Sequence, residues 1–133
     1  MEFRMLDTYL LSKKGATYDY PFDIYVRVYR VCGKIFALIN EQNKPIAINL
    51  KCNPLYAEEL RISYECVESG YHMDKKHWNT VTTGGDVDDL MMEELIDHSY
   101  NLVVAGLTKK QRESLWFGEL FLLVYQKSYR RAI

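Results

Sequence analysis

The sequence of 133 residues has few of the residues that mark fibrous, low-complexity or covalently cross-linked proteins. Its 7 glycines and 3 prolines follow no period, which excludes collagen-like and low-complexity chains. Its 3 cysteines are odd in number and form no CxxC pair, which excludes a disulfide framework and a zinc knuckle. We therefore interpret the cysteines as small apolar residues of a protein in a reducing compartment.

Long apolar runs and an excess of basic charge are also lacking. No run reaches the roughly 18 uninterrupted apolar residues that a membrane-spanning helix needs. Residues 1–7 carry acidic side chains where a secretion signal needs a basic start, so we expect a cytoplasmic protein without a membrane partner. The formal net charge is −1, so any binding to nucleic acid must depend on a local basic patch.

What the sequence does contain is the composition and patterning of one globular domain. Hydrophobic residues make up 48% of the chain and charged residues 26%. Alternating β-branched and aromatic residues predict strands, whereas apolar residues at helical spacing predict helices. The expected elements, in chain order, are a helix over 2–13, strands over 24–31, 35–39 and 46–50, a helix over 54–64 that starts at Asn53-Pro54, a strand over 78–82, and helices that begin at Asp86 and at Thr108.

This order predicts an α+β domain in which a mainly antiparallel sheet is flanked by helices, with the order α-β-β-β-α-β(-β)-α plus a C-terminal helix. The apolar stretch 115–125 covers too much of that last helix for one exposed face. We expect this stretch to pack on the sheet or to join a partner chain.

Residues 70–81 form a distinctive string, which reads GYHMDKKHWNTV. It is similar to the signature of the MmcQ/YjbR family of small bacterial proteins, and other segments resemble that family in the same order: 20–22, 26–28, 33–37, 49–54 and 95–100. The resemblance implies a YjbR-like fold, related to CyaY-like and secretion-chaperone-like folds, and DNA binding through a "double wing" motif. It covers residues 3–113 and assigns no role to 116–133. We therefore expect a domain over 1–113 and a C-terminal helical extension over 114–133, packed on that domain or on a partner.

The segment 71–79 interleaves cationic and aromatic side chains, as sites for nucleic acid do. Lysine and histidine can contact phosphates, tyrosine and tryptophan can stack on a base, and asparagine can hydrogen-bond to a base edge. The candidate residues are Tyr71, His72, Lys75, Lys76, His77, Trp78 and Asn79, supported by Lys51 and Arg61. Each neutralised phosphate adds about −0.9 to the salt slope, so about four cations predict weak, salt-sensitive binding to DNA. A homodimer through the C-terminal helix would double the patch.

Other interpretations of the same residues stay open. Trp78 can be a core residue and the lysines a solvated loop. The chain can instead be a protein–protein interaction or chaperone-like module that uses the sheet face or the C-terminal helix. It can also be a small-molecule-binding or resistance protein with a pocket beside Trp78 and His72. His72 and His77 lack the closely spaced second pair typical of zinc sites, so we expect no metal, no cofactor and no catalytic residue.

Overall fold

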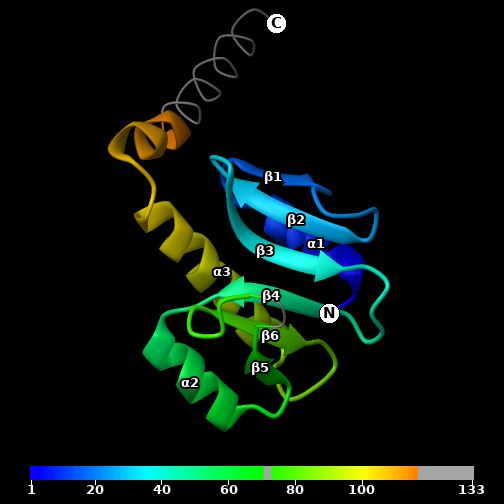
Figure 1. Ribbon diagram of the computed structural model, residues 1–133. Coiled ribbons are helices and arrows are strands. Elements are labelled where there is room, and N and C mark those ends of the chain that lie inside the picture. Colours follow the sequence, from blue (N-terminus) through cyan, green and yellow to red (C-terminus); the bar gives the residue numbers. More distant parts are fainter. Residues whose placement is uncertain (71–72, 117–133) are drawn as a thin grey trace, which may run out of the picture.

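The computed structural model describes residues 1–70 and 73–116 of the protein (Figure 1). It has an α+β fold, which confirms the predicted class. The labelled elements, in chain order, are α1 (Phe3–Leu11), β1 (Ala16–Asp19), β2 (Val26–Val31), β3 (Lys34–Asn40), β4 (Ala47–Lys51), α2 (Pro54–Ser63), β5 (Val67–Ser69), β6 (Trp78–Thr82) and α3 (Asp89–Ala105). Residues 109–116 form a further helical segment. The predictions for Tyr71, His72 and the tail 117–133 fall outside the described residues.

The strands form one 6-stranded sheet of order β1-β2-β3-β4-β6-β5, and every pair of neighbours is antiparallel. Because successive side chains of a strand point to opposite faces, paired residues form rows that share a face. One row is apolar and buried, and it consists of Ile39, Ile48, Val81 and Val67. The adjacent row lies on the other face, and it consists of Leu38, Asn49, Thr80 and Glu68. The sheet therefore has an apolar face and a polar face.

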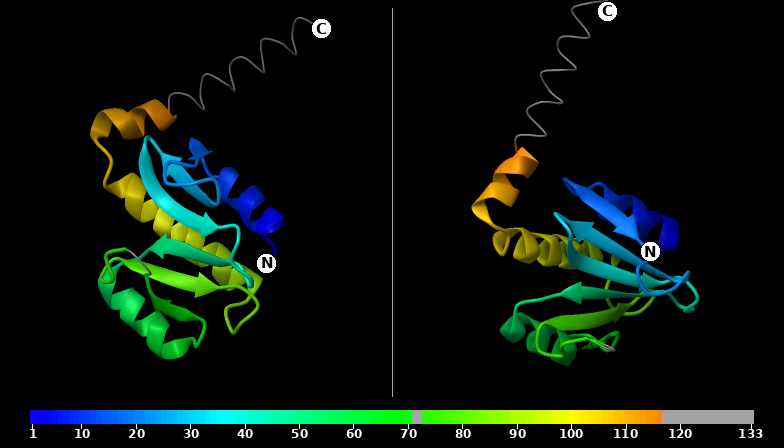
Figure 2. Two further views of the ribbon diagram at one scale, coloured as in Figure 1. Left: turned by 45° about the vertical axis from the view of Figure 1, so that its right-hand side comes forward. Right: turned by 45° about the horizontal axis from the view of Figure 1, so that its top comes forward.

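Helices α1 and α3 cover the apolar face, while α2 lies beside β5 (Figures 1 and 2). Leu6 and Leu10, one turn apart on α1, are fully buried. Helix α3 contributes the longer apolar stripe, which consists of Met92, Leu95, Ile96, Tyr100 and Val103. Burial of each large side chain stabilises the fold by about 1.5–3 kcal/mol. No helix in the described part of the chain is both long and apolar enough to cross a membrane.

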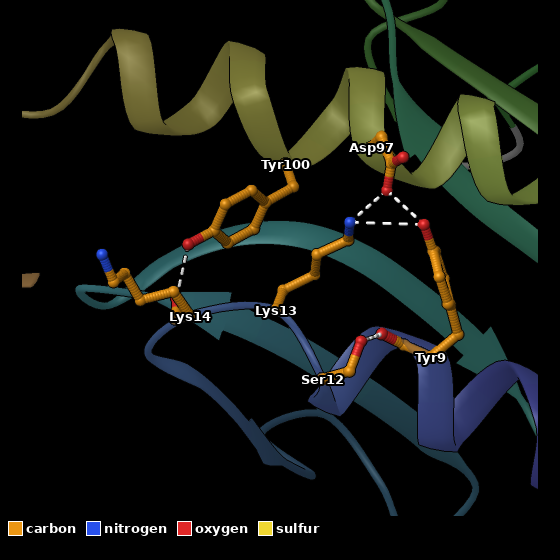
Figure 3. A network of polar contacts seen from close by, with 6 residues as sticks. All are labelled: Tyr9, Ser12, Lys13, Lys14, Asp97 and Tyr100. Atoms are coloured by element: carbon orange, nitrogen blue, oxygen red, sulfur yellow. Dashed lines mark hydrogen bonds and ion pairs between the residues drawn. The ribbon is translucent and has the colours of Figure 1, made fainter. Parts of the chain in front are cut away.

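A polar network joins α1 to α3 (Figure 3). The Tyr9 hydroxyl donates a hydrogen bond of 2.6 Å to Asp97 Oδ1, and Lys13 Nζ forms an ion pair with the same carboxylate. Further along α3, the Tyr100 hydroxyl donates to the carbonyl oxygen of Lys14. Burial and the hydrogen bond to Asp97 raise the pKa of Tyr9. These contacts fix the C-terminal end of α1 against α3.

The two strands at the sheet edges were the hardest to predict. The expected elements did not include β1, because three of the four side chains of this strand are exposed and show no alternation. The expected order allowed one or two strands between α2 and α3, but only residues 78–82 were assigned to one. Strand β5 lies before them, and with 3 residues it is too short to show a period.

The two predicted helix starts had different outcomes. The prediction that Asp86 caps α3 is wrong, because Asp88 is the cap and accepts a hydrogen bond of 2.8 Å from Met91 N. The Asp86 carboxylate instead accepts hydrogen bonds from the backbone N–H groups of Glu65 and Cys66, which lie between α2 and β5. The predicted start at Thr108 is confirmed, because the Thr108 and Gln111 side chains bind each other's backbone N–H groups.

Candidate nucleic-acid interface

The cationic residues of the candidate segment lie on a tight turn over 74–77, directly before β6. The carbonyl oxygen of Asp74 accepts hydrogen bonds from His77 N at 3.3 Å and from Trp78 N at 3.0 Å. Its carboxylate accepts one from Lys76 N at 2.9 Å and contacts His77 Nδ1 at 2.7 Å. The hydrogen bond from His77 lowers the pKa of Asp74. Asp74 therefore fixes the turn on which Lys75 and Lys76 are exposed beside it.

Arg61 of α2 holds the same turn from the other side. Its Nε donates a hydrogen bond of 2.7 Å to Asn79 Oδ1, and a terminal nitrogen donates to the carbonyl oxygens of Lys75 and, at 3.4 Å, Trp78. The guanidinium is thus used within the fold, as a link between α2 and the turn. A fork of N–H donors in one plane suits this role better than a single ammonium group does.

Asn79 lies beneath the surface, and a base edge cannot reach its amide. The residue is 2% exposed, and its Nδ2 donates a hydrogen bond of 3.3 Å to the carbonyl oxygen of Ala57. With Oδ1 bound to Arg61, the amide on β6 satisfies two polar groups of α2. The structure therefore corrects the prediction that Asn79 reads a base, because its burial leaves it a structural role.

Lys51 and Trp78 are brought together as cross-strand partners at the end of β4 and the start of β6. The carbonyl oxygen of His77 accepts a hydrogen bond of 2.8 Å from Cys52 N, which extends the pairing toward the turn. Gly70 N donates to the Trp78 carbonyl oxygen at 2.7 Å, and a Cβ atom at Gly70 would lie 2.8 Å from Trp78 Cβ. Only glycine fits this approach without a shift. Trp78 itself is half-buried.

The ammonium groups of Lys51, Lys75 and Lys76 have no carboxylate partner among the described residues. Lys75 and Lys76 are exposed, and Lys51 is half-buried. These lysines gather at one end of β4 and β6, and we call them the basic end.

A groove of about 1160 Å³ lies on the polar face of the sheet and reaches the turn through Lys75. Its lining includes the polar row and the rims on both sides, and the residues that matter here are Phe22, Asp23, Leu38, Asn40, Asn49, Arg61, Glu68, Gly70, Lys75 and Thr80. The sequence prediction missed this groove. A signal existed in the period-2 polar residues of β4 and β6, but the sequence does not show that these two strands are neighbours in the sheet.

Titratable groups elsewhere are used within the fold. Burial raises the pKa of the Cys52 thiol to about 11, which keeps it protonated at neutral pH. Burial lowers the pKa of His98, whose Nε2 accepts a hydrogen bond of 3.2 Å from Asn53 N. In the described part of the chain, no three His, Cys, Asp or Glu side chains are grouped so that they could hold a metal ion.

Comparison with known proteins places this arrangement in a family. The model of the YjbR family matches residues 11–102, which include the turn and the groove. The chain belongs to the YjbR family. It is 37% identical over 94 residues to YbdF of Escherichia coli O157:H7, with 71% of this chain and 77% of that protein covered. It is 33% identical over 108 residues to YjbR of Escherichia coli K12, with 80% of this chain and 91% of that protein covered.

The YjbR-like fold is also found among solved structures. The crystal structure of a Deinococcus radiodurans protein superposes with a TM-score of 0.77 at 34% identity, covering 83% of this chain and 84% of that chain. A Pseudomonas syringae protein superposes with a TM-score of 0.67 at 26% identity, covering 77% of this chain and 98% of that chain.

Proposed function

We propose that the protein is a non-enzymatic nucleic-acid-binding protein that contacts phosphates through the basic end. What supports the proposal is the position of Lys51, Lys75 and Lys76 on one end of the sheet without a carboxylate partner among the described residues. The backbone that carries Lys75 and Lys76 is held by Asp74 and Arg61. A fixed backbone lowers the entropy that must be lost when the lysines meet a phosphate chain.

The binding expected from so few cations is weak and depends on salt. Three phosphate contacts predict a slope of about −2 to −3 in a plot of log affinity against log salt. Since the net charge of the chain is −1, no long-range attraction adds to the contacts of the basic end. We therefore expect binding that is measurable at low salt and weak at physiological salt.

The test is fluorescence anisotropy of labelled oligonucleotides at low salt, with Lys75→Ala/Lys76→Ala against the wild type. The matched control is Lys109→Ala/Lys110→Ala, which removes the same charge from exposed positions of the helical segment 109–116. We expect the first variant to lose about tenfold or more in affinity and to have a shallower salt slope, and the control to bind like the wild type. Equal losses in both variants would mean that net charge matters and the basic end does not. Absence of binding by the wild type would remove the proposal.

A further inference from the structure

The groove on the polar face begins where the basic end stops, because Lys75 belongs to both. Its opposite rim carries Phe22, whose side chain is 67% exposed. The loop behind Phe22 is fixed by Asp23, whose Oδ1 accepts hydrogen bonds from Tyr25 N at 2.7 Å and Val26 N at 2.9 Å. An exposed ring on a fixed loop, across a groove from cations, is an arrangement that suits stacking on a base next to a bound phosphate.

The centre of the groove floor carries uncharged hydrogen-bonding side chains, those of Asn49 and Thr80. Thr80 Oγ1 donates a hydrogen bond of 2.5 Å to Asn49 Oδ1, which orients the amide of Asn49 on the neighbouring strand. The row ends on β5 with Glu68, which is exposed and has no ion-pair partner among the described residues. From β3 to β5 the floor thus changes from apolar to amide and hydroxyl, and then to carboxylate.

Glu68 has the wrong charge for a site that only attracts phosphates. Its carboxylate lines the same groove as Lys75 and would repel the backbone of a nucleic acid. A carboxylate is favourable there when a base presents an N–H donor to it, as the amino group of cytosine does. In a duplex the bases are stacked on one another, whereas in a single strand a base can turn its amino group toward Glu68 and its face toward Phe22.

We propose that the groove receives the bases of single-stranded nucleic acid, with Phe22 as the stacking ring and Glu68 as the residue that favours cytosine over thymine. This inference rests on the proposed function, because the phosphates of the same strand would lie on the basic end. Base stacking on one ring contributes about 1–3 kcal/mol. A hydrogen-bonded carboxylate discriminates between bases by a similar amount, so the expected preference is about tenfold.

The experiment measures anisotropy at low salt with labelled oligo-dC, oligo-dT and a duplex of equal length. We expect the wild type to bind oligo-dC about tenfold more tightly than oligo-dT, and both more tightly than the duplex. Glu68→Ala should abolish the preference and bind oligo-dT at least as tightly as the wild type. Its control, Glu113→Ala, removes an exposed carboxylate from the helical segment 109–116 and should keep the preference.

Phe22→Ala should weaken binding to both single strands by about tenfold and leave the duplex unaffected. Its control is Leu90→Ala, which removes a side chain that is 73% exposed on α3 and should change nothing. Duplex binding as tight as single-strand binding, or single-strand affinity unchanged in Phe22→Ala, would overturn the role of the groove while the basic end could still bind. A preference for oligo-dC that persists in Glu68→Ala would overturn the role of Glu68. If the wild type binds no oligonucleotide, the proposed function itself fails.

Discussion

The hydroxyl of Ser99 is inserted between two strands of the sheet, and its removal is the sharpest test of how α3 supports the basic end. Pairing between β3 and β4 runs as far as Ala37 and Leu50. Beyond that point the Ser99 hydroxyl donates a hydrogen bond of 2.6 Å to the Phe36 carbonyl oxygen and accepts one of 2.9 Å from Lys51 N. A side chain of α3 thus bridges the two strands where their ladder ends.

Ser99→Ala would leave both backbone groups without this partner. Ser99 is fully buried, so water cannot easily replace the hydroxyl. An unsatisfied buried donor or acceptor costs about 1–3 kcal/mol, and two of them predict a loss of about 2–6 kcal/mol in the free energy of unfolding. This loss is large for a domain whose total stability is on the order of 5–15 kcal/mol.

Urea denaturation followed by circular dichroism measures this loss. The control is Ser114→Ala, which removes an exposed hydroxyl that donates a single hydrogen bond of 2.7 Å to the Gln111 carbonyl oxygen. We expect the control to change the free energy of unfolding by less than about 0.5 kcal/mol. A change equally small in Ser99→Ala would refute the bridging role of the hydroxyl.

Three further predictions follow from contacts described above. Arg61→Lys keeps the charge but loses the planar set of N–H donors that holds the turn. We expect the free energy of unfolding in urea to fall by about 1–3 kcal/mol and oligonucleotide binding measured by anisotropy to weaken. Binding equal to that of the wild type would contradict the positioning role of Arg61. Tyr9→Phe should lower stability by about 0.5–1.5 kcal/mol in the same assay, because one hydrogen bond to a partly exposed carboxylate is lost. Hydrogen bonds from the Cys66 thiol and from the backbone N–H groups of Glu65 and Cys66 lower the pKa of Asp86 to about 2. Since the unfolded pKa is about 4, this stabilisation is present above pH ~4 and is lost as the pH falls toward 2. Denaturation at a series of pH values should therefore show a shallower acid decline for Asp86→Asn than for the wild type, and equal slopes would contradict it.

Local signals made most of the fold predictable. Asn53 accepts hydrogen bonds from Leu55 N and Tyr56 N, as expected of a cap followed by proline at the first helical position. Strands β4 and β6 were also predictable from a local signal, because their buried and half-buried side chains alternate. Strand β1 was not, because three of its four side chains remain exposed, so the sequence shows no buried alternation there. Asp86 was misassigned because a carboxylate after two glycines suits a cap equally well, and only the fold brings the backbone of residues 65–66 to it.

The candidate site was predictable only in part, because residue type does not reveal whether a polar group already has a partner. The lysines of the turn were chosen as candidates because cationic and aromatic residues are interleaved in 71–79. Arg61 and Asn79 were assigned to nucleic acid as well, yet each binds groups that the fold brings from another element. The groove depends on strand register: Asn49 and Thr80 become neighbours only when β6 is placed beside β4, with no strand between them.

The basic end and the groove would contribute differently to binding. An exposed ion pair contributes about 0–1 kcal/mol, and ordering a lysine side chain costs up to about 2 kcal/mol, so contacts of Lys75 and Lys76 alone hold a ligand weakly. Stacking on Phe22 depends little on salt. If both act, raising the salt concentration should first remove the contribution of the lysines and leave that of the ring. The effect of Lys75→Ala/Lys76→Ala should then shrink as salt rises, while the effect of Phe22→Ala should persist, because only the first contribution depends on counterion release.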